Sequence, residues 1–222
     1  MALASHTGRA QFIASSDRLQ AFSSQTRKTV LQGFQAISSV AKRLDPNKVE
    51  VAFASRPTKA FRARRTKNLV EMLERHEFQH DPHLMQKSLS ELIEHQIIRK
   101  LPVKKMGFNI NPISRKHVSI YIFTDGNWGD DPKRACLVEK PVESLIHEVK
   151  HRKLSPQQVT MHFVRFGDSA EGFRHLQYLD CFGEREDIDF DIVDVKHISS
   201  NVVSLFYGPL SHHSDREGEE FY

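Results

Sequence analysis

The spacing of hydrophobic residues changes repeatedly along this chain, and the changes predict helices that alternate with strands. Over residues 24–44 the apolar positions recur at steps of three and four, which places them on one face of a helix. Over residues 49–54 they alternate, as they do in a strand, and residues 117–123 form the clearest strand pattern. The remaining predictions are helices at 68–75, 84–101, 141–150 and 170–179, a basic edge strand at 59–65, and strands at 159–166 and 188–193.

Strands that alternate with helices from the start of a chain are typical of an α/β fold. We therefore expect an open, mostly parallel sheet with helices on both faces, a Rossmann-like three-layer arrangement. The short apolar segment 11–14 is interpreted as a first strand in the middle of this sheet, and the alternative is a leader outside the fold. The predicted organisation is a flexible leader at 1–9, one domain at 10–208 and a polar tail at 209–222.

Composition narrows the class of protein. The chain has 222 residues, of which 39% are hydrophobic and 27% charged, so it can bury a core and is not a disordered type. Its apolar runs are too short to span a bilayer, its start lacks a signal-peptide core, and its two cysteines cannot form a disulfide framework. We expect a cytoplasmic protein without a transmembrane segment. The net charge of +4 does not by itself imply a nucleic-acid partner.

Three segments carry a family resemblance. Residues 44–53 have the form of a helix-to-strand junction, residues 120–126 are an apolar strand followed by Thr-Asp-Gly, and residues 162–194 contain a strand–helix–strand run. In this order the segments resemble a von Willebrand factor A domain, in the divergent form common in fungal intracellular proteins, over roughly residues 10–200. The resemblance implies a non-enzymatic module that binds a protein partner, and a metal-ion-dependent adhesion site at the carboxyl ends of the strands.

The metal-ion-dependent adhesion site that the resemblance implies is degenerate in this sequence. Ala14 stands at its first Asp, Ser16 keeps its first Ser, Arg18 replaces its second Ser, and the position of its Thr falls near His83. Only Asp125 of the Thr-Asp-Gly motif matches directly. Because Mg²⁺ prefers six oxygen ligands, Ser16 and Asp125 alone would hold it poorly. We expect metal dependence to be weakened or lost and no cofactor to be needed, although Mg²⁺ at these two residues stays open.

Arg18 suggests a substitute for the metal. If its guanidinium faces the metal position, it can offset the charge of Asp125 through a charge-assisted hydrogen bond. The alternative is that Arg18 points into water.

The loop after the Thr-Asp-Gly motif is the second part of the candidate site. It contains Asn127, Trp128 and Asp130, and together with Arg18 these are the predicted partner contacts. Trp128 is the single tryptophan of the chain, and an exposed tryptophan would be a natural anchor for a partner. The alternative is a polar turn with Trp128 folded back onto the domain.

Other chemistries find less support in the sequence. There is no Gly-x-Ser-x-Gly elbow, phosphate-binding loop or dinucleotide fingerprint, so we do not expect an enzyme, and an uncharacterised α/β enzyme is kept as an alternative. Histidines cluster in sequence without an evident third ligand for zinc: His76, His80, His83 and His95. Two basic runs, at 56–67 and 99–105, keep open a binder of nucleic acid or of anionic surfaces.

Overall fold

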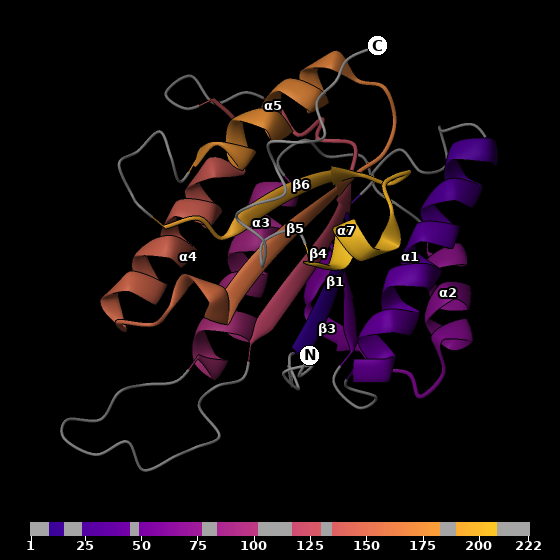
Figure 1. The fold of residues 1–222 in the computed structure, drawn as a ribbon, viewed down its shortest axis with the longest axis horizontal. Coiled ribbons are helices and arrows are strands. Elements are labelled where there is room, and N and C mark those ends of the chain that lie inside the picture. The colour runs from indigo at the N-terminus through magenta and orange to yellow at the C-terminus, as the bar shows by residue number, and fades with distance from the viewer. Residues whose placement is uncertain are drawn as a thin grey trace.

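A twisted six-stranded sheet runs through the middle of the molecule (Figure 1). The structure is a computed structural model that describes residues 9–15, 24–44, 49–76, 84–101, 117–129, 135–182 and 190–207. The strands are β1 (Arg9–Ser15), β2 (Glu50–Phe53), β3 (Arg56–Phe61), β4 (Val118–Thr124), β5 (Val159–Arg165) and β6 (Val193–His197). Their order is β3-β2-β1-β4-β5-β6, and the β2–β3 pair is antiparallel while the other pairs are parallel. The predicted α/β class with a mostly parallel sheet is therefore confirmed.

The short apolar segment near the start of the chain is a central strand. β1 lies between β2 and β4 and pairs in parallel with both, with Gln11 opposite Glu50 on one side and Ile120 on the other. This confirms the central strand predicted at 11–14 and excludes its alternative, a leader outside the fold. Ser15, the last residue of β1, lies opposite Thr124, the last residue of β4. The chain therefore leaves these two strands side by side.

Helices cover both faces of the sheet (Figure 1). One face packs against α1 (Ser24–Leu44), α2 (Thr66–Glu74) and α7 (Val202–Tyr207), and the other against α3 (Leu84–Leu92), α4 (Glu139–His151) and α5 (Ala170–Asp180). Three short helical segments complete the described parts: η1 (Ile93–Ile97), η2 (Ile98–Lys100) and η4 (Pro156–Gln158). None of the helices described here is long and apolar enough to cross a membrane.

The three- and four-residue spacing in α1 explains how this helix packs. Its buried residues include Val30, Phe34 and Ile37, and the Phe34 ring meets the Phe123 ring edge-on at 5.7 Å between centroids. In β4 nearly every residue is buried because successive side chains enter different cores. Ile122, for example, packs on the side of α4 while Phe123 packs on the side of α1. Alternation alone therefore could not have revealed this strand's two buried faces.

Some boundaries differ from the sequence prediction. The strand predicted at 188–193 meets the observed β6, Val193–His197, only at its last residue. Residues 190–192 do not belong to a strand, and 188 and 189 lie outside the described residues. The Asp191 carboxylate accepts the Val193 N–H at the start of β6. The basic edge strand is confirmed as β3 but ends at Phe61, so 62–65 lie beyond it. The helix predicted at 84–101 is divided into α3, a π-helical turn η1 and a 3₁₀ turn η2. Apart from Arg9, the predicted leader at 1–9 and tail at 209–222 lie outside the described residues.

Candidate functional site

The carboxyl ends of the parallel strands form the candidate site. The strand order changes direction between β1 and β4, and ligands of open α/β sheets bind at such a switch point. The last paired residues of four neighbouring strands lie in one row, which we call the carboxyl edge with the segments that follow it: Ser15, Thr124, Arg165 and His197. Asp125 follows Thr124 directly and so lies at the switch point, where the resemblance had placed it.

The turn after β4 is held by its own side chains. The Thr124 hydroxyl accepts the Gly126 N–H at 3.0 Å, and the Asp125 carboxylate accepts the Asn127 N–H at 3.2 Å. Gly126 has φ +76°, a left-handed conformation that glycine adopts without strain. Asp125 and Asn127 are both partly exposed. The turn therefore fixes one carboxylate and one amide at the exit of β4, within reach of solvent.

Helix α5 packs closely against this turn. Gly126 and Gly172 approach so closely that a Cβ built on Gly172 would lie 2.0 Å from the backbone oxygen of Asp125. His175, on the same helix, places Nδ1 2.9 Å from the backbone oxygen of Gly126, and Arg174 places Nη2 3.3 Å from its Nε2. Since a carbonyl only accepts and a guanidinium only donates, the proton of this imidazole is assigned to Nδ1. The turn is thus fixed by backbone packing and by a buried hydrogen bond.

Trp128 is not an exposed anchor, and that prediction was wrong. The residue is 3% exposed, its ring stacks on His175 with centroids 6.3 Å apart, and it lies 6.0 Å from the Phe163 ring. Positive φ angles at Gly126 and Gly129 turn the loop back toward the sheet, which brings the indole into the core. The alternative, a turn with Trp128 folded onto the domain, is therefore confirmed.

Phe173 is the exposed aromatic residue at this edge among those described. It is 48% exposed on α5, and the Arg165 guanidinium lies 4.9 Å from its ring centroid in a cation–π contact. Sequence analysis did not single it out. Helical spacing gave no signal for its exposure, because Phe173 lies three residues before the buried Leu176 and would be grouped with the same face of α5.

The edge next to Phe173 is cationic. Arg165 forms no ion pair with a carboxylate among the described residues; its Nη1 lies 3.5 Å from the backbone oxygen of Gly167. His197 follows in the next strand of the row, and burial together with the charge of Arg165 lowers the pKa of its imidazole, against the opposing charge of Asp168. This part of the edge therefore presents a guanidinium and an aromatic ring, and it complements the carboxylate at β4.

The magnesium site expected at Ser16 and Asp125 stays a prediction, because Ser16 lies outside the described residues. The Asp125 carboxylate accepts the Asn127 N–H, and no group of three or more His, Cys, Asp or Glu residues in the described ranges could hold a metal ion. Ser16, Arg18 and Asp130 lie outside the described residues, so the proposed contact between Arg18 and Asp125 stays a prediction. Of the four histidines considered for zinc, His76 stacks on the Phe53 ring at 3.6 Å, whereas His80 and His83 lie outside the described residues.

A second polar group, which sequence analysis missed, lies inside the sheet. Asp194 places Oδ2 3.5 Å from Nδ1 of His162 and Oδ1 3.3 Å from Nζ of Lys196, and Nε2 of His162 lies 3.2 Å from the Thr160 hydroxyl. A carboxylate, an imidazole and a hydroxyl in this order can activate a nucleophile. Here Thr160, His162 and Asp194 are each less than a tenth exposed, which closes them to a substrate. We interpret the group as structural.

Asp180, at the end of α5, makes stability depend on pH. The residue is exposed, but its carboxylate accepts the Val195 N–H at 2.8 Å. Burial of the carboxyl group and the nearby charge of Asp194 raise its pKa to about 7. The folded state then holds this proton more tightly than the unfolded state. The resulting stabilisation is complete below about pH 4 and is lost as the pH rises through about 7.

We expect Asp180→Asn to remove this pH dependence. The amide oxygen can still accept the Val195 N–H, and the side chain no longer ionises. The measurement is the free energy of urea unfolding at several pH values from 5 to 8. As the pH rises, the free energy of unfolding of the variant should increase relative to that of the wild type. Asp168→Asn, which removes an exposed carboxylate, is the control. If the free energy of unfolding depends on pH in the same way in the wild type and in Asp180→Asn, the raised pKa of Asp180 is contradicted.

Comparisons with known proteins give little further information. The chain matches no protein-family model and no curated protein. Two crystal forms of proximal thread matrix protein 1 from the mussel byssus resemble it with 10% sequence identity, at TM-scores of 0.45 and 0.42. Each match covers 90% of this chain but 45% and 44% of the mussel chain, so this chain spans less than half the length of that protein. A likeness of this degree does not establish a common function.

Proposed function

We propose that this chain is a non-enzymatic protein-interaction module of the von Willebrand factor A type, which binds a partner protein at its carboxyl edge. The observation that supports the proposal most is the position of Asp125. It directly follows the central strand β4, at the point where the strand order changes direction. The Thr-Asp-Gly motif that carried the resemblance thus lies where open α/β sheets bind their ligands.

The chemistry of the carboxyl edge suits a protein partner. Arginine is one of the residue types that contribute most binding energy at protein interfaces, and phenylalanine is enriched there. Arg165 and Phe173 lie in contact with each other. Asp125 and Asn127 add an acceptor and an amide that can fix the orientation of the partner. Phe173 takes the role that sequence analysis had given to Trp128.

Three of the described groups that could support catalysis are buried: Cys136, His162 and Asp194. Burial raises the pKa of the Cys136 thiol, which disfavours the thiolate that a nucleophile requires. His162 and Asp194 are closed to solvent as well. The proposed binding therefore proceeds through direct polar and aromatic contacts. Because only Asp125 of the implied adhesion site matches this sequence directly, we expect a chelator to leave the binding unchanged.

Affinity capture with matched variants tests the proposal. Immobilised wild-type chain, Phe173→Ser and Asp125→Asn are incubated with membrane-free extract of the organism that encodes the protein, and retained proteins are quantified by mass spectrometry. Leu44→Ser is the control, because Leu44 is 45% exposed and Phe173 is 48% exposed. Asp125→Asn preserves the acceptor for the Asn127 N–H.

We expect at least one partner whose retained amount is about tenfold lower or more on Phe173→Ser than on the wild type. On Leu44→Ser the retained amount should equal that on the wild type, and a chelator should change neither result. Its direct binding is then measured with the purified partner by calorimetry. If both edge variants retain the same proteins as the wild type, the interface does not lie at the carboxyl edge and the proposal is wrong.

A further inference from the structure

At the edge of the molecule opposite the carboxyl edge, the end of α1 lies beside the start of α2 (Figure 1). Six basic residues belong to these two segments and to the stretch that precedes α2. We call this set the basic corner: Lys42, Arg43, Arg62, Arg64, Arg65 and Lys67. Two contacts hold it together. Nζ of Lys42, in the last turn of α1, donates to the backbone oxygen of Ala63 at 2.5 Å, and Arg62 pairs with Glu50 at the start of β2. Sequence analysis had noted only the run at 56–67, whereas α1 adds two of the six cations.

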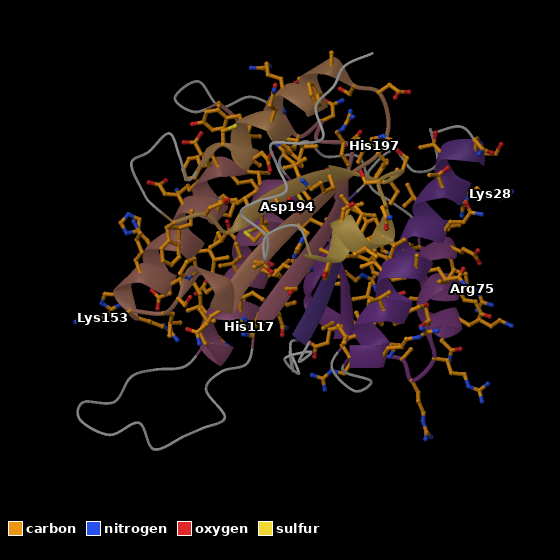
Figure 2. The ribbon with its side chains drawn as sticks, viewed as in Figure 1. Lys28, Arg75, His117, Lys153, Asp194 and His197 are labelled. Atoms are coloured by element: carbon orange, nitrogen blue, oxygen red, sulfur yellow. The ribbon has the colours of Figure 1, made fainter. Side chains whose placement is uncertain are left out.

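Half of these six cations form no ion pair with the described residues. Glu50 is buried and pairs with Arg62, and Glu71 lies 3.8 Å from Nζ of Lys67. Three cations are exposed and form no ion pair or side-chain hydrogen bond with another described residue: Arg43, Arg64 and Arg65. On the outer side of α1 and α2, side chains such as those of Lys28 and Arg75 point away from the sheet (Figure 2).

The stability of the fold does not explain the exposed cations of the basic corner. Arg43 complements the negative end of the α1 dipole, but Arg65 and Lys67 lie at the start of α2, where positive charge opposes the helix dipole. Arg65 is the N-cap residue of α2, and its side chain makes no capping hydrogen bond. Arg64 and Arg65 also lie beyond the end of β3, so they are not needed to block pairing at that edge. Their positions weaken the helix start, which points to a role in binding.

An exposed leucine indicates which kind of anionic partner would suit the basic corner. Leu44, the last residue of α1, follows Arg43 directly and is 45% exposed. An apolar side chain among cations suits the interface of an anionic membrane, where it can enter the headgroup layer. Nucleic acid would instead favour an exposed aromatic ring for stacking. The aromatic ring nearest in sequence, Phe61, is partly buried against Phe53 and lies under the ammonium group of Lys59.

We propose that the basic corner is a peripheral binding site for anionic phospholipid headgroups, with Leu44 entering the interfacial layer. The site is independent of the proposed partner interface, since it lies at the other end of the strands. A membrane bound there would leave the carboxyl edge facing the aqueous side.

Vesicle flotation tests this proposal on the full chain. The vesicles contain phosphatidylcholine with about 30% phosphatidylserine, or phosphatidylcholine alone. Since each cation near such a surface changes the partition coefficient about fivefold, the triple variant Arg43→Gln, Arg64→Gln and Arg65→Gln should reduce it about a hundredfold. Leu44→Ser should reduce it about fivefold. Binding should be absent from the neutral vesicles and weaken as salt is added.

A matched control removes the same charge elsewhere. Three exposed lysines with no ion pair among the described residues lie away from the basic corner, on α1, α3 and α4: Lys28, Lys87 and Lys140. Their combined replacement by Gln should change vesicle binding by less than about twofold.

Three results would overturn the proposal: no binding to the anionic vesicles at low salt, equal losses in the two triple variants, or a Leu44→Ser variant that binds like the wild type. The last result, together with binding of a single-stranded RNA oligonucleotide that the Arg triple variant abolishes, would assign the corner to nucleic acid instead. The partner-capture experiment uses membrane-free extract and edge variants, so either proposal can fail without the other.

Discussion

Replacing Gly172 by Ala should lower the free energy of unfolding by about 3 kcal/mol, at the upper end of what overpacking costs. A Cβ at this position would lie 2.0 Å from the backbone oxygen of Asp125 and 3.1 Å from the backbone carbon of Gly126. Both contacts are backbone atoms at the end of the central strand β4, which is paired on both sides. Neither α5 nor the turn can therefore move without breaking other contacts.

Gly33 provides the control for this prediction. A Cβ on Gly33 would also be crowded, 2.2 Å from Cδ1 of Ile198, but this atom is the end of a flexible side chain. Gly33 lies inside α1, where alanine is favoured over glycine by about 1 kcal/mol. Gly33→Ala should therefore change the stability by less than about 1 kcal/mol. Urea unfolding of both variants is the measurement, and equal losses would contradict the idea that backbone contact decides the effect.

The layered fold could be predicted because local periodicity and chain order agree. The face of α1 that contains Val30, Phe34 and Ile37 follows from helical spacing alone. β1 followed from a short apolar segment, since a parallel sheet needs a strand before the first crossover helix. The resemblance implied the position of Asp125 at the carboxyl edge, which agrees with the rule that turns after parallel strands meet at one edge of the sheet.

The details of the site could not be predicted because they depend on contacts between segments that are distant in sequence. Trp128 is buried because the loop reverses onto His175, which lies on a helix formed later in the chain. Nothing local distinguishes such a tryptophan from an exposed one. The basic corner has the same origin, since Lys42 meets Ala63 only after β2 and β3 have paired.

The start of β6 shows a second reason why the sequence pattern does not predict every detail of the fold. Apolar and polar residues alternate through both the predicted segment 188–193 and the observed strand Val193–His197, so the pattern alone does not fix the strand's register. The register is fixed by pairing, with Met161 opposite Val193 and His162 opposite Asp194.

His175 should be the most important single side chain for the rigidity of the turn after β4. It is 1% exposed, its imidazole donates to the backbone oxygen of Gly126, and its ring stacks on Trp128. His175→Ala removes the donor and the ring together and leaves a cavity beside an unsatisfied carbonyl. We expect a loss of about 3 kcal/mol in the free energy of unfolding, measured with urea.

Two further substitutions separate the contributions of the hydrogen bond and of the ring. His175→Phe keeps a ring against Trp128 but leaves the Gly126 carbonyl without its donor, whereas His175→Asn offers an amide donor near the position of Nδ1 without the ring. Each should lose about half as much stability as the alanine variant, because each keeps one of the two interactions. In His175→Asn the emission of the single tryptophan should shift toward that of exposed indole in the folded protein. If His175→Phe is as stable as the wild type, the hydrogen bond of His175 does not fix the turn, which is then held by the Thr124 and Asp125 side chains and by the packing against Gly172.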